Sequence, residues 1–182
     1  MQFTVALAEL QKALQKVLPA IPAKSTIPVL EHLHTKLQGS DLTFMATDQE
    51  ITIALTTTVS GEADGEVLIP ARQFTDLIKE LGNAGTVTIH VSDSQMVDIR
   101  TPTGTFQMKA LDAREFPLIP PFPESQSALL SKENLSRMAN KTVFAVSTEE
   151  YRPSMTGVFF QVRGEQATPV ATDGSRLTRV TI

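Results

Sequence analysis

The feature that most constrains this chain is a repeat at an offset of 125 residues. The segment 46–48, Ala-Thr-Asp, recurs at 171–173. The same offset, without gaps, aligns further identical pairs, among them Leu10 with Leu135, Pro28 with Pro153, Gly39 with Gly164, and Thr43 with Thr168. Self-similarity at a fixed period is the signature of a repeated structural unit. The second copy reaches residue 182 less than halfway through its unit, so the sequence predicts one complete domain followed by part of another.

Composition narrows the class of protein. Hydrophobic residues make up 41% of the 182 residues and charged residues 20%, as is typical of a soluble globular protein. Cysteine is absent, which excludes disulfides and suits a reducing compartment. The N-terminal residues Met1-Gln2-Phe3-Thr4 do not start a basic region followed by an apolar one, so no signal peptide is expected. No apolar run approaches the ~20 residues that span a bilayer. These features predict a cytoplasmic protein without a membrane partner.

Three segments carry apolar residues at helical spacing. Leu7, Leu10, Leu14, Val17 and Leu18 predict an amphipathic helix that ends near Pro19. A second helix is expected after Pro70, with a core face of Phe74, Leu77, Ile78 and Leu81 and a stop at Gly82-Asn83. The third is expected after Ser131 as its N-cap, marked by Leu135, Met138, Ala139 and Val143.

Between these helices the hydrophobic period changes to two, first from Pro28 onward, which predicts strands. Residues 2–110 are therefore expected to contain the order strand, helix and three strands twice in succession. Residues 60–65 are expected to form a loop. Four prolines among residues 112–127 predict an extended linker. The expected class is α+β, with a complete domain at 1–122 and the first half of a second at 123–182.

This order of motifs resembles the bacterial sliding clamp family, the beta subunit of DNA polymerase III. The matching pieces run from end to end of the chain in the family's order: Phe3-Thr4-Val5, Ile27-Pro28-Val29-Leu30, Ala46-Thr47-Asp48, Ile69-Pro70-Ala71-Arg72, Glu115-Phe116-Pro117 and Val170 to Leu177. The resemblance implies a DNA-clamp fold in which antiparallel sheets lie outside and helices line the inner face. It also implies a ring-shaped homodimer, when full length, that encircles duplex DNA as a non-enzymatic processivity factor.

The charge distribution bears on a DNA partner. A net charge of −4, taken alone, argues against nucleic acid. The three helical segments, however, hold seven Lys and Arg against four Asp and Glu, which leaves −7 for the remaining chain. Such side chains suit phosphate contacts without base readout, although an ordinary solvated helix face gives the same pattern. With the resemblance, the expected DNA-contacting residues are Lys12, Lys16, Lys24, Arg72, Arg137, Lys141 and Arg152.

The resemblance also implies two protein-binding sites. The family's docking pocket receives short linear motifs from the replicative DNA polymerase, the clamp loader and repair proteins. Its matching positions here are Met155, Thr172, Gly174, Ser175, Arg176 and Leu177. Phe106 and Met108 match an edge strand that forms the subunit interface. From pattern alone, the first set also fits a structural hairpin with Leu177 in the core, and the second set fits residues that face the domain's own core.

Two rival functions remain open from the residues. One is a stand-alone peptide-binding module that uses the pocket around Gly174 and never encircles DNA. The other is a metal-dependent hydrolase, since His32 and His34 lie on one side of a strand, although no carboxylate is placed to complete a site. Asp48 and Asp173 follow strands at turns, where Asp is favoured by its own backbone hydrogen bonding. No catalytic motif is present, so we expect neither catalysis nor a metal or other cofactor.

Overall fold

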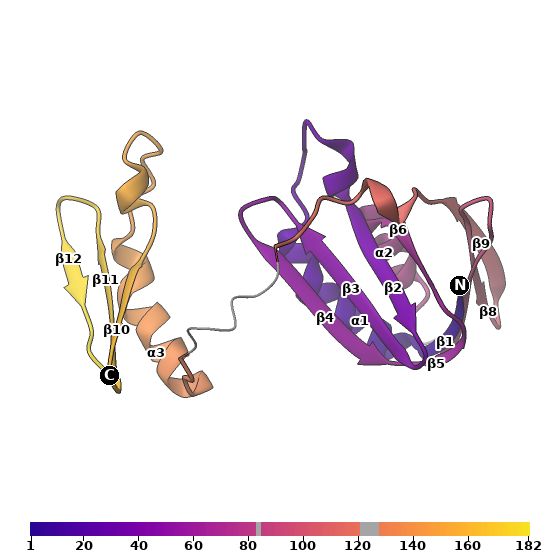
Figure 1. Cartoon of the computed structure of the whole chain (residues 1–182), viewed down its shortest axis with the longest axis horizontal. Coiled ribbons are helices and arrows are strands. Elements are labelled where there is room, and N and C mark those ends of the chain that lie inside the picture. The colour runs from indigo at the N-terminus through magenta and orange to yellow at the C-terminus, as the bar shows by residue number, and fades with distance from the viewer. Residues whose placement is uncertain (83–84, 121–127) are drawn as a thin grey trace. The chain divides into compact units, whose positions relative to one another are not determined.

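The computed structural model of the chain describes residues 1–82, 85–120 and 128–182. Backbone contacts divide the chain into two compact units, Met1–Pro120 and Pro121–Ile182 (Figure 1). The expected boundary between residues 122 and 123 and the prolines at 121 and 123 lie outside the described residues. The predicted α+β class is confirmed, because each unit combines antiparallel sheets with a few helices.

The first unit contains two successive halves with the same order of elements. The first half comprises β1 (Gln2–Ala6), α1 (Leu7–Val17), β2 (His32–Gln38), β3 (Asp41–Thr47) and β4 (Thr52–Thr58). After β5 (Ser60–Ala63), the second half comprises β6 (Gly65–Pro70), α2 (Ala71–Glu80), β7 (Thr86–Val91), β8 (Met96–Thr101) and β9 (Gly104–Lys109). The two long helices begin 64 residues apart, so the predicted internal repeat is confirmed.

The halves exchange their first strands. The five-stranded sheet has the order β5-β1-β7-β8-β9, and the four-stranded sheet has the order β4-β3-β2-β6. The first strand of each half therefore pairs with the sheet of the other half: β1 pairs with β7, and β6 pairs with β2. Ala6 pairs with Thr86, and Pro70 pairs with His32, so both exchanged strands end their pairing just before their helix begins.

The helices cover one face of the four-stranded sheet. α1 packs against β3 and β4, and α2 packs against β2 and β6, as Figure 1 shows behind that sheet. α1 buries Leu7, Leu10, Ala13, Leu14 and Val17 on one side, as its spacing predicts. The two helices also touch each other, where the side-chain amide of Gln11 donates to the carbonyl of Ile78 at 3.0 Å. One core thus joins both halves.

The expectation of a loop at residues 60–65 is wrong for β5. All four residues of β5 are exposed, so its sequence has no alternation of apolar side chains that would predict a strand. Its backbone instead pairs with β1, through Phe3 with Gly61 and Thr4 with Ser60. Gly61 lies so close to Gly39 that an added Cβ would stand 1.8 Å from the Gly39 carbonyl oxygen. Backbone pairing and this close approach, rather than a core-facing side chain, make the strand.

The second unit holds one half of this pattern in its described residues. Its helix α3 spans Lys132–Thr142, and its sheet has the order β10-β11-β12, formed by Phe159–Arg163, Gln166–Thr172 and Leu177–Arg179. Ser131 caps α3 as predicted, because its hydroxyl accepts from the amide of Asn134 at 3.1 Å. The hydroxyl of Thr178 donates to the Lys141 carbonyl at 2.8 Å and ties β12 to the helix.

The offset of 125 residues holds in three dimensions to the residue. Helix α1 maps onto α3, and β3 maps onto β11, without a shift at either end. The short 3-10 helices Leu18–Ala20 and Val143–Ala145 also correspond, and both Gly39 and Gly164 have positive φ, +59° and +57°. The sequence repeat therefore reports a repeated backbone.

Two further expectations differ from the structure. Pro28–Glu31 forms a 3-10 helix, so β2 begins at His32 rather than at Pro28. Ala113–Glu115 forms another within the expected linker. Within the part of the chain that the structure describes, no helix is both long and apolar enough to cross a membrane.

Candidate functional site

The turn that joins β11 to β12 is held by its own polar groups. The Asp173 carboxylate accepts from the backbone amides of Ser175 and Arg176, both at 2.9 Å. The Thr172 hydroxyl donates to the Arg176 carbonyl at 2.7 Å and accepts from the Gly174 amide at 3.1 Å. Gly174 has φ +90°, a left-handed conformation that favours glycine. The predicted hairpin turn is confirmed, and its residues are fixed relative to one another.

An ion pair adds charge to this turn. The Arg176 Nε donates to the Asp173 carboxylate at 2.8 Å. The Arg176 side chain, followed by the backbone amides, lowers the pKa of Asp173 to about 2. The Asp173 carboxylate is therefore ionised near neutral pH.

The turn also presents an apolar side chain to solvent. Leu177 is 68% exposed, so the alternative in which it belongs to the core of this unit does not apply to the described residues. An exposed leucine beside a rigid polar turn suits contact with an apolar side chain of a partner. The half-buried Met155 ends the 3-10 helix Pro153–Met155, and its carbonyl accepts from the Ser147 amide at 2.9 Å.

The structure brings Arg152 to this turn. A Cβ added at Gly174 would meet the Arg152 Nη1 at 3.4 Å, so the guanidinium lies directly over the glycine. Arg152 also stacks 5.4 Å from the centre of the Tyr151 ring and pairs with Glu149 at 3.8 Å. Arg152 is expected from the sequence to contact DNA, whereas in the structure it lies beside Gly174 of the β11–β12 turn. No spacing rule signals this contact, because 22 residues separate Arg152 from Gly174.

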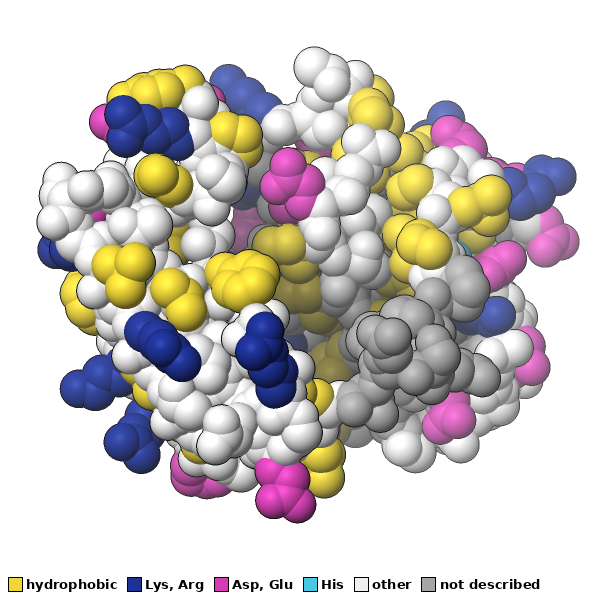
Figure 2. Space-filling view, turned by 60° about the vertical axis from the view of Figure 1, so that its left-hand side comes forward, with side chains coloured by type: hydrophobic (Ala, Val, Ile, Leu, Met, Phe, Trp, Pro, Cys, Tyr) yellow, Lys and Arg dark blue, Asp and Glu magenta, His cyan; other side chains and the backbone are white. Residues whose placement is uncertain are grey.

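Four of the seven basic residues expected to contact DNA lie on exposed faces of α1 and α3. On α1, Lys12 and Lys16 are exposed on the side opposite the buried leucines. Arg137 and Lys141 are exposed at the positions of α3 that correspond to them through the offset of 125 residues. Figure 2 shows Lys and Arg side chains exposed beside hydrophobic ones on the face turned toward the viewer. The repeat thus conserves the cationic character of both positions.

These cations differ in how they are paired. The Lys12 ammonium bonds the Glu9 carboxylate at 2.8 Å, and this bond lowers the pKa of Glu9. Among the described residues, no carboxylate lies within ion-pair distance of Lys16, Arg137 or Lys141. Helix α3 therefore offers the more available positive charge.

Arg72 and Lys24 are both exposed in the first unit. Arg72, in the first turn of α2, donates to the Pro22 carbonyl at 3.4 Å. This bond links α2 to the loop that follows α1, and Lys24 lies two residues farther along that loop. Arg72 thus lies on a helix, whereas Lys24 lies on the loop to which that helix is bonded.

β9, which carries Phe106 and Met108, is an edge strand, as predicted. The two side chains lie opposite Ile99 and Val97, which are buried. Met108 packs against the core, and Phe106 is 38% exposed. The free backbone edge of β9, with Phe106 beside it, is the part of this strand available to another chain.

The two histidines of the expected pair have different neighbours. The His32 Nδ1 lies 3.1 Å from the Pro28 carbonyl oxygen. His34 lies 3.6 Å from Glu66 and 5.1 Å from the Phe116 ring, and burial lowers its pKa. Among the described residues, no group of three or more acidic or histidine side chains is placed to hold a metal ion.

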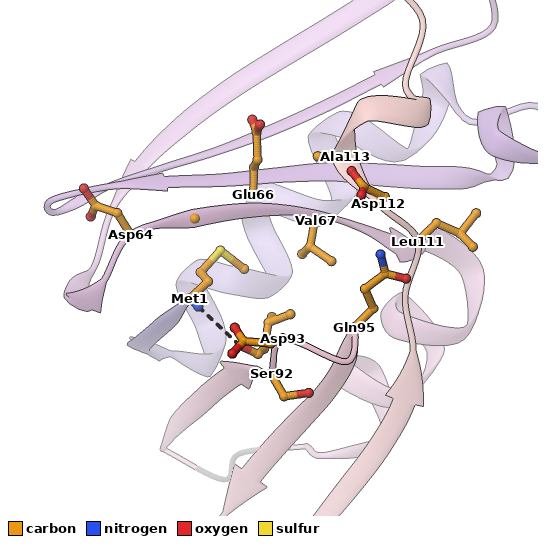
Figure 3. Close-up of a pocket in the computed structure, with 12 residues that line it drawn as sticks. Met1, Asp64, Glu66, Val67, Ser92, Asp93, Gln95, Leu111, Asp112 and Ala113 are labelled. Atoms are coloured by element: carbon orange, nitrogen blue, oxygen red, sulfur yellow. Dashed lines mark hydrogen bonds between the residues drawn. The ribbon is translucent and has the colours of Figure 1, made fainter.

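One pocket was not anticipated by sequence analysis. It measures about 300 Å³ and lies where the start of the chain, β6, the β7–β8 turn and the segment after β9 meet (Figure 3). Its carboxylates come from Asp64, Glu66, Asp93 and Asp112, while the Met1 ammonium donates to the Val91 carbonyl at 3.2 Å. These segments are far apart in sequence, and only the exchange of strands between the halves brings them together.

Comparisons with known proteins agree with the geometry. A family model for the N-terminal domain of the DNA polymerase III beta subunit matches residues 1–120, and one for its central domain matches residues 129–182. The beta sliding clamp of Chlamydia pneumoniae is 32% identical over 99% of this chain and 49% of that protein. The beta sliding clamp of Bacillus subtilis is 32% identical over 97% of this chain and 49% of that protein.

A solved structure resembles the chain over its whole length. The crystal structure of the DNA polymerase sliding clamp from Bacillus subtilis matches with a TM-score of 0.95 and 30% identity, over 100% of this chain and 50% of that one. The chain therefore spans about half the length of the curated relatives it matches.

Proposed function

The chain belongs to the family of the DNA polymerase III beta subunit, and from this premise we propose that it acts in a non-enzymatic sliding clamp that encircles duplex DNA. In this role enclosure, rather than tight binding, keeps the protein on DNA. The clamp tethers the replicative polymerase and other proteins that carry short linear motifs. The proposal places the protein in the cytoplasm. A clamp of this kind needs no catalytic group and no cofactor.

The observation that carries this proposal is the repeat of cationic positions. Lys12 and Lys16 on α1 correspond to Arg137 and Lys141 on α3, and all four are exposed. To repeat the fold alone, only the buried apolar positions of the helix would have to recur in the second unit. The recurrence of positive charge on the exposed side of both helices suits contact with phosphates at any sequence, which sliding requires.

In the same proposal, the turn at Thr172–Leu177 receives partner motifs. Met155, Arg152 and Arg176 would frame the site, Gly174 would admit the partner's backbone, and Leu177 would contact an apolar side chain. The edge of β9 at Phe106 and Met108 would join another subunit. A stand-alone peptide-binding module is not favoured, because the family match covers the whole first unit as well as the second.

Salt dependence tests the DNA-binding part of the proposal. Binding of a short duplex is measured by fluorescence anisotropy over a range of salt concentrations, for the chain and for Arg137→Glu with Lys141→Glu. Each lost phosphate contact lowers the slope of log affinity against log salt by about 0.9, so the double variant should lower it by about 2. The equivalent pair Lys12→Glu and Lys16→Glu should have a smaller effect, because Glu9 already pairs with Lys12.

Lys109→Glu is the matched control, since Lys109 is an exposed cation on strand β9 rather than on a helix. It should leave the slope unchanged. Equal losses for all three variants would mean that the helices have no special role. Enclosure itself is tested on a chain extended to the length of the relatives: it should stay on circular DNA and leave when that DNA is cut.

A further inference from the structure

A loop of the first unit, residues 22–27, carries one cation, Lys24. The loop lies between the 3-10 helices Leu18–Ala20 and Pro28–Glu31. Lys24 is exposed, and among the described residues no carboxylate lies within ion-pair distance of it. A phosphate contact is stronger when the backbone that carries the cation is already ordered, because binding then costs less conformational entropy. The question is therefore what holds this loop.

The hydrophobic core fixes the two ends of the loop. Ala20 and Ile21 are buried just before it, and Leu30 is buried just after it. The Leu30 amide also donates to the Ile27 carbonyl at 3.1 Å. These contacts determine where the chain leaves the core and where it returns. They do not reach the middle of the loop, where Lys24 lies.

Polar contacts hold the middle of the loop on both sides of Lys24. The Glu31 carboxylate accepts from the backbone amide of Ser25 at 3.2 Å. The Ser25 hydroxyl in turn accepts from the amide two residues later at 3.0 Å. Before the lysine, the Pro22 carbonyl accepts from the Arg72 guanidinium at 3.4 Å. Lys24 thus lies between two tethered residues, one of which is its direct neighbour.

The carboxylate of Glu31 is unexpected beside a cation that is offered to DNA. A negative charge near a phosphate contact opposes binding by repulsion. Across the described ranges 1–82, 85–120 and 128–182, Glu31 forms no ion pair, so it does not serve to neutralise a cation. Its recorded contact is the bond to Ser25, and a charged acceptor makes such a bond stronger than a neutral one does.

The second copy of the repeat separates this bond from the needs of the fold. Through the offset of 125 residues, Lys24 corresponds to Glu149, and Glu31 corresponds to Thr156. The Thr156 hydroxyl donates to the Pro153 carbonyl at 2.9 Å, within its own turn. The fold therefore forms without a carboxylate at this position. The cation and the carboxylate occur together in the first copy, and neither occurs at the equivalent position of the second.

We propose that Glu31 is a positioning residue for DNA contact: by accepting from the Ser25 amide, it holds Lys24 where the ammonium meets a phosphate. The inference rests on the proposed clamp role. It assigns a part in DNA binding to a residue whose own charge opposes DNA. Arg72 supports the same loop from its other side, through Pro22.

Two substitutions that remove the same charge should have opposite effects on the binding of a short duplex, measured by fluorescence anisotropy. In Glu31→Gln the amide oxygen still accepts from Ser25 and the repulsion is gone, so binding should be unchanged or tighter. In Glu31→Ala the acceptor is lost, so binding should weaken about 3- to 10-fold, as in Lys24→Ala, because each variant loses one phosphate contact. Glu31→Ala should have no further effect in a chain that already carries Lys24→Ala.

Glu80→Ala is the matched control. Glu80 is an exposed carboxylate of α2, the helix that carries Arg72, and within the described part of the chain it forms no ion pair. Its removal takes away a negative charge without touching the loop, so DNA binding should not weaken. A loss equal to that of Glu31→Ala would contradict a specific role for Glu31.

NMR relaxation tests the positioning role without DNA. The backbone order parameter of Lys24 should fall to about 0.6 or below in Glu31→Ala and remain at its original value in Glu31→Gln. An unchanged order parameter, or DNA binding by Glu31→Ala as tight as that of Glu31→Gln, would overturn the inference and leave the clamp role standing. If Lys24→Ala itself bound DNA as tightly as the original chain, the loop would not contact DNA, and the assignments of Lys24 and of Glu31 would both be wrong.

Discussion

The turns at 48–51 and 173–176 share one backbone and carry different side chains. In both, an aspartate accepts from the amides two and three residues later, and the preceding threonine hydroxyl donates to the same carbonyl position. The first turn then shows Gln49, Glu50 and Ile51, whereas the second shows Gly174, Ser175 and Arg176. The shared part maintains the turn, and the different part is free to serve a partner.

This difference separates structure from function within one motif. Ala-Thr-Asp recurs because its hydroxyl and carboxylate satisfy the backbone of a tight turn, whatever that turn binds. The glycine under Arg152, the Asp173–Arg176 ion pair and the exposed Leu177 occur in the second copy alone. If the turns differ in function, changes at these positions should affect partner binding, and changes at the first turn should not.

The largest effect is expected for Leu177→Ala. Removing an apolar side chain that a partner motif buries should weaken binding of a peptide with the clamp-binding motif of a replicative polymerase by about 10- to 100-fold. Isothermal titration calorimetry measures the affinity. Ile51→Ala is the control, since Ile51 is an exposed apolar residue of the first turn, at 58%. Unchanged affinity in Leu177→Ala, or an equal loss in Ile51→Ala, would show that the second turn is not the docking site.

A smaller effect, on the free energy of unfolding, is expected from substituting the residue with positive φ in each turn, Gly174 and Gln49. Gly174→Ala places a side chain at φ +90° and should destabilise the second unit by about 1 kcal/mol. Gln49 already tolerates φ +78°, so Gln49→Gly should stabilise the first unit by roughly 0.5 kcal/mol or less. Urea unfolding followed by the fluorescence of Tyr151, the single tyrosine, reports on the second unit.

The matched control is Gly157→Ala, since a Cβ there meets nothing within 4 Å. It should leave the unfolding midpoint of the second unit unchanged. A larger loss in Gly157→Ala than in Gly174→Ala would mean that φ does not limit the turn.

Local pattern and repeat predict most of the fold. The spacing of Leu7, Leu10 and Leu14 predicts α1, and Ser131 predicts the start of α3, because each signal lies within the element it specifies. β5 escapes prediction because its four residues are exposed and its pairing with β1 spans about sixty residues of sequence. The exchange of β1 and β6 between sheets is equally non-local, since no residue in either strand encodes its partner.

The candidate site is predictable where one segment builds it. Thr172, Asp173 and Gly174 form a turn with local hydrogen bonds, which the sequence indicates directly. Arg152 reaches the turn from another loop, so its place emerges only in three dimensions. Exposure is also non-local: Leu135 has the spacing of a core residue, yet it is 53% exposed.

The smallest effect is expected in the titration of the two aspartates. Arg176 is the main cause that lowers the pKa of Asp173 from 3.8 to about 2, while backbone amides alone lower that of Asp48. Arg176→Ala should therefore raise the pKa of Asp173 toward 3.8 and leave that of Asp48 unchanged, as followed by NMR of the side-chain carboxyl carbons. Because the folded pKa lies below the unfolded one, the turn's stabilisation by the carboxylate is fully present above pH 3.8 and is lost as pH falls through about 2. In Arg176→Ala the folded pKa lies closer to the unfolded one, so this stabilisation should be smaller and its loss should be complete at higher pH. If the titration of Asp173 did not move, the ion pair would not distinguish the two turns, and their difference would rest on Gly174 and Leu177.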